Sequence, residues 1–340
     1  MEIKNIFIVL TPFQKSTMLQ LFNPLFNERS TLVFHSEHTT FNDYNCEIAS
    51  INNFKFSRKK LLNYKFYQES KKAIARIRDE INDMEHLYKL GKKLNIYIGS
   101  EKDIFTQMFL NTSFIAVRLK DLIAVEEGLG YYKYDPSIKI KFTKLAYKYL
   151  APLLFKEKLN FIYTLGVDPR INKVYARLPD MLPIKSNEVT YYSIAKRESW
   201  ADKKDTIASS KILIFSFPNQ DYGVDGKEKV KIFETLIESL KEKTIIIKPH
   251  PREDSGFFNI FADYENIQVI NKDKTGESLN YFEYQKIINF SSSVIIDILT
   301  AGYPTKRVYT IFMKENSKLA FFTKTSCIRL SELYNYNFEN

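Results

Sequence analysis

The segment Thr244-Ile-Ile-Ile-Lys-Pro-His-Pro251 joins a run of isoleucines to a histidine that stands between two prolines. Two further segments follow the same plan, in which an apolar run ends directly in polar residues: Leu122-Ile-Ala-Val-Glu-Glu-Gly128 and Lys286-Ile-Ile-Asn-Phe-Ser-Ser-Ser293. Short apolar runs of this kind are typical of strands that are buried on both faces of a parallel sheet. Because open α/β sheets bind ligands at the carboxyl ends of their strands, the polar motifs predict a functional site on an α/β fold.

Strand-like and helix-like segments alternate along the chain. In the first half we predict strands at residues 5–10, 31–34, 95–98, 122–125 and 161–164. We also predict one helix that begins at Thr11-Pro12 and another that spans about residues 59–92. In the second half we predict strands at residues 211–215, 244–247, 267–270, 286–289 and 307–311, and helices at residues 227–240, 257–264 and 293–299. This alternation predicts βαβ units and mostly parallel sheets.

The chain is long enough for two domains, because its 340 residues exceed the roughly 250–300 at which a single core usually divides. A polar stretch at residues 185–209 reads as a linker. We therefore predict an N-terminal domain at residues 1–184 and a C-terminal domain at residues 210–340. Both would be Rossmann-like, with mostly parallel sheets that face each other across a cleft, which is a GT-B-like architecture.

Composition favours a globular protein of the cytoplasm. The apolar run Ile6-Phe-Ile-Val-Leu10 is too short and too poorly flanked to be a signal peptide. No stretch reaches the roughly 18–20 apolar residues that span a bilayer. The two cysteines, Cys46 and Cys327, are far apart in the sequence, which excludes a disulfide framework and zinc-ligand spacing, and we expect both to be buried as small apolar side chains.

The formal net charge of +10 arises from 50 Lys and Arg against 40 Asp and Glu, and it suits nucleic acid, anionic lipid or a phosphate-bearing substrate. Residues 138–158 contain a stripe of apolar side chains at helical spacing between lysines, namely Ile138, Phe142, Leu145, Tyr149 and Leu153. In one interpretation the stripe faces the core and the lysines are in solvent. In the other, a basic amphipathic helix makes peripheral contact with the anionic inner face of the plasma membrane.

Glu126-Glu127-Gly128 places two carboxylates at the end of a strand. Because successive side chains of a strand point to opposite faces, one carboxylate can point into a ligand site while the other anchors the loop. Gly128 allows the backbone to turn sharply at this point. A carboxylate so placed is a candidate general base for a sugar hydroxyl, and the sequence leaves open which of the two glutamates it is.

Among the four histidines of the chain, His250 alone directly follows an apolar, strand-like run and has a proline on each side. The prolines restrict the backbone around the imidazole. With Lys248 and Arg252 nearby, the imidazole is suited to meet a phosphate and, when protonated, to donate a proton to it.

The serines Ser291, Ser292 and Ser293 precede an apolar helical pattern, so they would occupy the N-cap and first turn of a helix. Helix N-termini present unpaired amide groups, and serine hydroxyls add further donors, which suits a phosphate. The loop at residues 216–223 follows the first strand of the second domain, and its Asn219 is a further candidate contact. The sequence contains no clear constellation of metal ligands.

In this order and rough spacing, the three motifs resemble those of bacterial sialyltransferases with a GT-B-like fold, notably glycosyltransferase family 52, and of the bacterial capsule polysialyltransferases. These families are recognised by an acidic-acidic-glycine motif, a His-Pro motif and a serine/threonine motif. The matching segments here are Glu126-Glu127-Gly128, His250-Pro251 and Ser291-Ser292-Ser293. The resemblance covers about half of the chain.

The resemblance implies an enzyme that transfers sialic acid from CMP-sialic acid to a hydroxyl, such as one of galactose, on a lipooligosaccharide or capsule at the bacterial surface. The transfer would invert the anomeric carbon and would need no metal or other cofactor. By motif position, Glu126 would be the general base, Glu127 would orient the loop, and His250 would assist the departure of CMP. The donor contacts would be Lys248, Pro251, Arg252, Asn219, Ser291, Ser292 and Ser293.

Two other functions fit parts of the sequence. Transferases that pass glycerol phosphate or ribitol phosphate from CDP-alcohols also resemble the second half, through a His-Pro segment and a Ser-Ser motif ahead of an aspartate such as Asp297, but they lack a clear equivalent of Glu126-Glu127-Gly128. A nucleic-acid-binding protein would fit the charge and the 15% aromatic content. Because no nucleic-acid motif is present, we expect the partners to be a nucleotide sugar and a glycan acceptor, and not nucleic acid.

Overall fold

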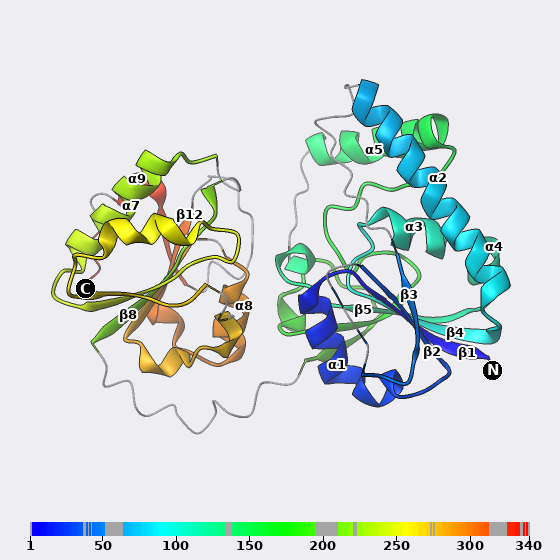
Figure 1. Ribbon diagram of the computed structural model, residues 1–340, viewed down its shortest axis with the longest axis horizontal. Helices are drawn as coiled ribbons and strands as arrows, with labels where there is room; N and C mark the ends of the chain where they lie inside the picture. Colours follow the sequence, from blue (N-terminus) through cyan, green and yellow to red (C-terminus); the bar gives the residue numbers. More distant parts are fainter. Residues whose placement is uncertain are drawn as a thin grey trace. The chain divides into compact units, whose positions relative to one another are not determined.

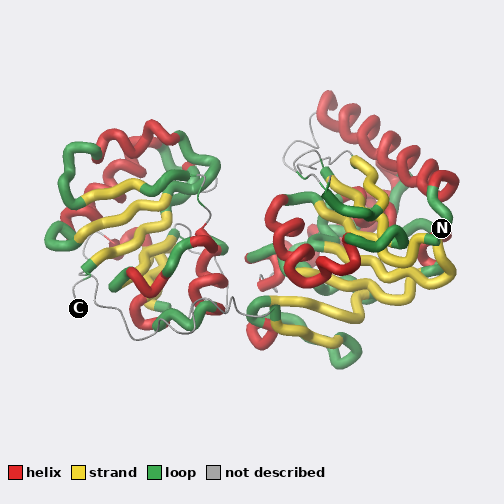
Figure 2. Tube along the Cα trace, turned by 60° about the horizontal axis from the view of Figure 1, so that its bottom comes forward, coloured by secondary structure: helices red, strands yellow, loops and turns green. Residues whose placement is uncertain are grey.

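The computed structural model describes residues 2–36, 39, 41, 43–51, 64–132, 138–194, 210–219, 223–272, 274, 276–290, 292–312, 325–333, 336 and 338. The chain divides into two compact units, Met1–Ile194 and Ala195–Asn340 (Figure 1). In each unit the strands lie side by side in one layer with helices outside it (Figure 2). All strand pairs among the described residues are parallel, which confirms the predicted α/β class with parallel sheets.

Among the described residues, the sheet of the first unit has seven strands in the order β3-β2-β1-β4-β5-β6-β7. The strands are β1 (Ile3–Val9), β2 (Thr31–His35), β3 (Glu47–Ser50), β4 (Leu90–Ile98), β5 (Leu119–Val125), β6 (Ile171–Ala176) and β7 (Thr190–Ser193). The helices are α1 (Pro12–Phe26), α2 (Tyr64–Leu87), α3 (Ile104–Leu110), α4 (Ser113–Ala116) and α5 (Ile138–Phe155), with short 3-10 helices η2 (Leu129–Tyr132) and η3 (Pro179–Met181). Strands were correctly predicted at the positions of β1, β2, β4 and β5.

The start of α1 follows from its sequence. Thr11 accepts a hydrogen bond from the backbone amide of Gln14 at 3.2 Å, and a proline occupies the first helical turn. The helix packs on the sheet over an aromatic cluster in which the Phe7 ring lies 4.4 Å from that of Phe26 and 4.2 Å from that of Tyr97. This packing places the first turn of α1 at the carboxyl edge of the sheet, close to the end of β5.

Among the described residues, the second unit has a six-stranded sheet in the order β10-β9-β8-β11-β12-β13. Its strands are β8 (Lys211–Phe215), β9 (Thr244–Lys248), β10 (Ile267–Val269), β11 (Lys286–Asn289), β12 (Val308–Phe312) and β13 (Ser326–Arg329). Its helices are α7 (Gly226–Ser239), α8 (Val294–Thr300) and α9 (Leu330–Leu333), with 3-10 helices η5 (Ser255–Phe261), η6 (Gly276–Ser278), η7 (Tyr281–Glu283) and η8 (Thr305–Arg307). The five strands and the longer helix predicted here are confirmed, and the short helix expected at residues 257–264 is the 3-10 helix η5.

The predicted strand at residues 161–164 is wrong, because these residues form a loop and the next strand after β5 is β6. Phe161 and Leu165 of this loop are nevertheless buried, and the amide of Leu165 donates to the carbonyl of Gly130 at 3.0 Å. A loop whose apolar side chains enter the core has the same local composition as a short buried strand, and the prediction failed for that reason.

Three strands at the edges of the sheets, β3, β7 and β13, were not predicted from the sequence. Most side chains of β3 and β7 are exposed, so these strands lack the apolar runs that mark the central strands. β7 lies within the predicted linker at residues 185–209 and belongs to the first unit, while residues 195–209 lie outside the described part of the chain. Cys46 is buried as expected, but Cys327 is exposed on the edge strand β13, so that expectation is wrong.

The apolar stripe on α5 does not face the core. Its five side chains range from 51% exposed at Leu145 to 77% exposed at Leu153. The interpretation of α5 as a core-facing helix with solvated lysines is therefore wrong. Among the described helices, none combines the length and the apolar character needed to cross a bilayer.

Candidate active site

Glu126 and Glu127 directly follow β5, and their side chains enter different surroundings. The amide of Glu126 donates to the carbonyl of Tyr175 on β6 at 2.9 Å, so the pairing of β5 extends one residue beyond its end. Neighbouring side chains on a strand point to opposite faces. Gly128 then turns the chain with a φ of +117°, a conformation that favours glycine.

Glu126 is anchored by an arginine and a tyrosine. Its carboxylate accepts hydrogen bonds from Nε of Arg177 at 2.8 Å and from the backbone amide of Arg177 at 2.7 Å, and a second guanidinium nitrogen forms an ion pair with it. The Tyr132 hydroxyl donates to the same carboxylate at 2.6 Å. Only 1% of Glu126 is exposed. These contacts give Glu126 a holding role, because it ties the end of β5 to η2 and to the segment after β6.

Glu127 is partly exposed and lies among other carboxyl groups. The side chains of Gln14 and Ser100 donate hydrogen bonds to it. Burial, reinforced by the negative charges of Asp103 and Glu101, raises the pKa of Glu127 to about 7, although both hydrogen bonds oppose the rise. A carboxyl group with a pKa close to neutral pH is suited to accept a proton during a reaction.

The position of Gln14 is set by its neighbours. Its Oε1 accepts the backbone amide of Leu10 at 2.6 Å, so the NH2 group is the part of the amide that meets Glu127. Gly99, at the end of β4, leaves room for this arrangement, because a Cβ there would collide with the Gln14 side chain. The start of α1 therefore delivers a hydrogen-bond donor to the carboxylate of Glu127.

The two carboxyl groups near Glu127 also have raised pKa values. Burial raises the pKa of Asp103 to about 6, although Thr106 donates to this carboxylate through its amide at 2.8 Å and its hydroxyl at 2.6 Å. Burial likewise raises the pKa of Glu101. Because the charge of each group affects the others, the three carboxyls titrate as a coupled cluster at the carboxyl ends of β4 and β5.

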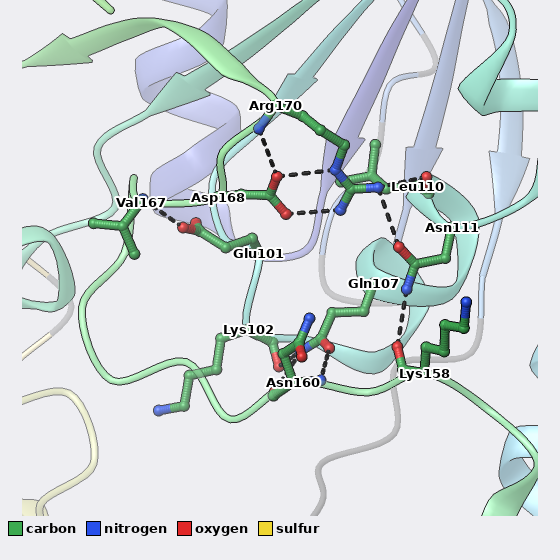
Figure 3. Close-up of polar contacts among 10 residues, drawn as sticks. All are labelled: Glu101, Lys102, Gln107, Leu110, Asn111, Lys158, Asn160, Val167, Asp168 and Arg170. Atoms are coloured by element: carbon green, nitrogen blue, oxygen red, sulfur yellow. Dashed lines mark hydrogen bonds and ion pairs between the residues drawn. The ribbon is translucent and has the colours of Figure 1, made fainter. Parts of the chain in front are cut away.

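A polar network holds Glu101 and joins the loop before β6 to the end of α3 (Figure 3). Glu101 accepts the backbone amide of Val167 at 2.9 Å. Arg170 pairs with Asp168 at 2.7 Å and donates to the carbonyl of Leu110 at 2.6 Å. The contacts that this network makes are internal to the unit, so we assign it a supporting role for the carboxyl cluster.

In the second unit, the His-Pro turn after β9 is built around Glu253. The backbone amide of His250 donates to the Glu253 carboxylate, and the amide of Glu253 donates to the carbonyl of His250 at 2.9 Å. The same carboxylate accepts the hydroxyl of Ser216 at 2.7 Å and forms an ion pair with Lys229 of α7. The turn that carries the imidazole is therefore fixed to the end of β8 and to a helix.

Lys229 is a buried cation. Its side chain is 2% exposed, and its ammonium donates to the carbonyl of Phe217 at 2.8 Å. The ammonium also lies 4.4 Å from the centre of the Phe257 ring and 5.4 Å from that of Phe258, which are favourable cation–π distances. Burial lowers the pKa of Lys229, and the hydrogen bond and charge of Glu253 oppose this change.

His250 is half-buried, and one ring nitrogen has a backbone partner. The amide of Arg252 donates to Nδ1 of His250 at 3.2 Å. Since Nδ1 accepts this bond, the neutral ring carries its proton on Nε2. Nε2 is accordingly the nitrogen that can donate to a substrate oxygen.

The charged and cyclic neighbours of His250 differ in their surroundings. Lys248 is 3% exposed, and its ammonium donates to the carbonyls of Pro249 at 2.5 Å and Lys272 at 3.0 Å. These contacts give Lys248 a role in holding the turn. Pro251 and Arg252 are exposed.

The predicted serine site is described in part. Ser291 lies outside the described residues. Ser292 is half-buried and its hydroxyl accepts the amide of Val294 at 3.4 Å, while Ser293 is exposed and directly precedes α8. Asn219 is partly buried, and its carbonyl accepts the amide of Gly223 at 2.9 Å.

Several residues of these two clusters could not be recognised from local sequence patterns. They are Ser100, Asp103, Tyr132, Arg177 and Lys229. Arg177, for example, is 51 residues from Glu126. Glu253 is an exception, because a carboxylate three residues after His250 in a proline-bounded turn is a local signal for a side chain that closes the turn.

We expect Glu253→Gln to lower the free energy of unfolding by about 3–5 kcal/mol, because it removes the charge that faces buried Lys229. Urea unfolding followed by circular dichroism measures the change. The matched control is Glu238→Gln, which breaks the exposed pair with Lys241 and should change the free energy of unfolding by less than about 1 kcal/mol. Equal effects of the two substitutions would contradict the assignment of Glu253 as the centre of the turn.

The sequence profile of the family described as alpha-2,8-polysialyltransferase (POLYST) matches residues 5–298. The chain belongs to the alpha-2,8-polysialyltransferase family. The matched residues include the acidic pair, the His-Pro turn and the serines, and they cover most of the chain. The resemblance to polysialyltransferases that the three motifs predict is thereby confirmed.

Solved structures show that this member of the polysialyltransferase family has a GT-B fold. It is similar to an alpha/beta-galactoside alpha-2,3-sialyltransferase of Photobacterium phosphoreum, with a TM-score of 0.55 and 11% identity over 97% of this chain and 99% of that chain. It is also similar to the glycosyltransferase SnogD of Streptomyces nogalater, with a TM-score of 0.53 and 11% identity over 99% of this chain and 89% of that chain. The predicted GT-B class is confirmed by these similarities, which at such low identity concern the fold alone.

Among curated proteins, an uncharacterized protein of Haemophilus influenzae is 23% identical over 188 residues. The alignment covers 48% of this chain and 58% of that relative. The chain thus aligns with little more than half the length of the curated relative.

Proposed function

We propose that the protein transfers sialic acid from CMP-sialic acid to a sugar hydroxyl with inversion at the anomeric carbon. The observation that carries this proposal is the carboxyl group of Glu127, which lies at the carboxyl end of β5 with a pKa of about 7 in a chain of the polysialyltransferase family. Near neutral pH such a group is present in substantial part as the carboxylate and can accept a proton.

On the acceptor side, Glu127 takes the proton of the attacking hydroxyl while the hydroxyl oxygen bonds to the anomeric carbon. Gln14 orients the carboxylate through its NH2 group. Motif position alone favours Glu126 for this role, but its carboxylate is engaged by Arg177 and Tyr132 and is almost completely buried. The contacts therefore support Glu127 as the base and Glu126 as its anchor.

On the donor side, the bond between the anomeric carbon and the CMP phosphate oxygen breaks, and its electron pair leaves with the phosphate. In the proposal Nε2 of His250 donates to that oxygen, and the exposed cation of Arg252 stabilises the developing charge. Pro251 keeps the turn in place, and Ser292 and Ser293 provide further donors. Lys248 acts through the turn that it holds.

The remaining predicted donor contacts, Asn219 and Ser291, are retained as proposed contacts to the nucleotide sugar. No metal takes part in this proposal, because an imidazole, a guanidinium and hydroxyl groups can together neutralise the departing phosphate. Initial rates that are unchanged after treatment with EDTA would support this point, and a loss that added divalent cations restore would contradict it.

The acceptor is proposed to be a bacterial surface glycan, either a capsule or a lipooligosaccharide, modified at the cytoplasmic face of the membrane. The description of the matched family points to a sialic acid hydroxyl as the acceptor, whereas the motif resemblance implies a hydroxyl of galactose. A panel that contains both galactosides and sialylated galactosides distinguishes these two acceptors.

The test of the proposed function is the release of CMP from CMP-sialic acid in the presence of this panel, with mass analysis of the products. We expect CMP release that depends on an acceptor and a product heavier by one or more sialic acids. CDP-glycerol is the control donor and should not react. Turnover of CDP-glycerol without turnover of CMP-sialic acid would replace this proposal by that of a glycerol phosphate transferase.

A further inference from the structure

The surface of α5 carries an unusual row of large exposed apolar side chains. The exposed fractions are 72% for Ile138, 64% for Phe142, 51% for Leu145, 65% for Tyr149 and 77% for Leu153. The successive spacings of four, three, four and four residues place them on one face of the helix. Single exposed apolar residues are common on proteins, but a continuous row of this kind marks a surface that meets another apolar phase.

The opposite face of α5 is the one that meets the protein. Ala151 and Phe155 are buried, and the centre of the Phe155 ring lies 5.9 Å from that of Tyr67 of α2. Helices α2 and α5 lie next to each other in Figure 1. Arg78 of α2 adds a bond to the Phe155 carbonyl at 3.2 Å and an ion pair with Glu157 at 2.7 Å. At 3.6 residues per turn, the nine residues from Phe142 to Ala151 span two and a half turns, so the apolar row points about 180° away from the buried face.

The charge of α5 has one sign. Lys141, Lys144 and Lys148 are exposed and follow one border of the apolar row. Between Ile138 and Lys156 the sequence contains no Asp or Glu. The helix thus combines an apolar face with a basic border, which is the pattern of helices that lie in the interface of an anionic bilayer.

We propose that α5 docks the protein on a bilayer surface that contains anionic phospholipids. The apolar row enters the region between headgroups and acyl chains, and the three lysines contact lipid phosphates. A second copy of the chain is a poorer fit for this face, because an antiparallel two-fold contact would bring the lysine borders of two α5 helices together. Nucleic acid is a poor fit as well, since the aliphatic members of the row, Ile138, Leu145 and Leu153, can neither stack on bases nor hydrogen-bond to them.

This inference does not depend on the proposed sialyltransferase activity. It would locate that activity at a membrane surface, because α5 begins six residues after Tyr132, whose hydroxyl donates to the Glu126 carboxylate. A glycan acceptor that is attached to a lipid would then be presented to the same unit that carries the acidic pair.

The experiment is cosedimentation of the full-length protein with vesicles of phosphatidylcholine, with and without phosphatidylglycerol. We expect binding to vesicles that contain phosphatidylglycerol, weaker binding at high salt, and at least about tenfold weaker binding for the triple variant Phe142→Ser, Leu145→Ser, Leu153→Ser. The triple variant Lys141→Gln, Lys144→Gln, Lys148→Gln should lose the preference for the anionic vesicles.

The matched control is the double variant Leu87→Ser, Val117→Ser, which removes two apolar side chains that are 74% and 78% exposed elsewhere on the first unit. It should bind vesicles as the unaltered protein does. Unchanged binding of the α5 serine variant, or a loss in the control of the same size, would overturn the proposal. A change in oligomeric state of the α5 serine variant in sedimentation velocity, without weaker vesicle binding, would assign the face to contact between copies instead.

Discussion

Glu127→Gln is expected to lower kcat for sialyl transfer by at least about 100-fold, because glutamine keeps the shape of the side chain but cannot accept a proton from the acceptor. The unaltered protein should lose activity as the pH falls through about 7, the pKa of Glu127, since protonation removes the base. In the variant, the residual rate should no longer follow this titration. Initial rates of CMP release at saturating acceptor, measured across this pH range, test both expectations.

Two further variants separate the roles of the neighbouring carboxyls. Asp103→Asn keeps the cap of α3 but removes a negative charge that raises the pKa of Glu127, so the midpoint of the pH profile should move to lower pH. Glu126→Gln removes the charge that faces Arg177, whose side chain is 9% exposed, and should lower the free energy of unfolding while the pH dependence of the remaining activity persists. A pH profile that disappears in Glu126→Gln and persists in Glu127→Gln would return the role of base to Glu126.

The division of labour between the two glutamates shows where the sequence stops being informative. The run Leu122–Val125 and the glycine at position 128 were enough to place a carboxylate pair at the end of a strand. They could not assign the roles, because these depend on Arg177 and Gln14, which reach the pair from other elements. The raised pKa of Glu127 likewise depends on tertiary structure, since it is caused by burial and by two carboxylates that are distant in sequence but close in space.

The sequence predicted the position of a strand where the side chains of that strand are buried along most of its length. Central strands such as β8 and β9 are apolar along their length, so their positions follow from composition alone. Apolar character and strand do not coincide in two places. The edge strand β3 is a strand with mostly exposed side chains, whereas the loop around Phe161 is buried but is not a strand. An apolar stripe at helical spacing also does not show whether the stripe packs on the protein core or faces outward. For α5 the stripe is exposed, so the interpretation as a core-facing helix is wrong.

His250→Ala is expected to lower kcat by at least about 100-fold while the KM for CMP-sialic acid changes much less, because the imidazole acts on a phosphate oxygen whose negative charge develops as the bond breaks. The bond from the Arg252 amide to Nδ1 leaves Nε2 as the nitrogen that donates. His250→Gln keeps a side-chain donor at the turn and should retain more activity than the alanine variant. Steady-state rates with varied CMP-sialic acid measure both parameters.

Glu253 provides the comparison that separates the imidazole itself from the turn that carries it. The Glu253 carboxylate accepts the backbone amide of His250, so Glu253→Gln should reduce activity by displacing the imidazole. Because Glu253 is buried and paired with Lys229, the same substitution should also lower the free energy of unfolding. His250→Ala removes a half-buried side chain and leaves the ion pair of Lys229 with Glu253 in place, so its stability should be close to that of the unaltered protein. If His250→Ala instead raises KM with kcat unchanged, the imidazole contributes to donor binding alone, and another group must assist the departure of CMP.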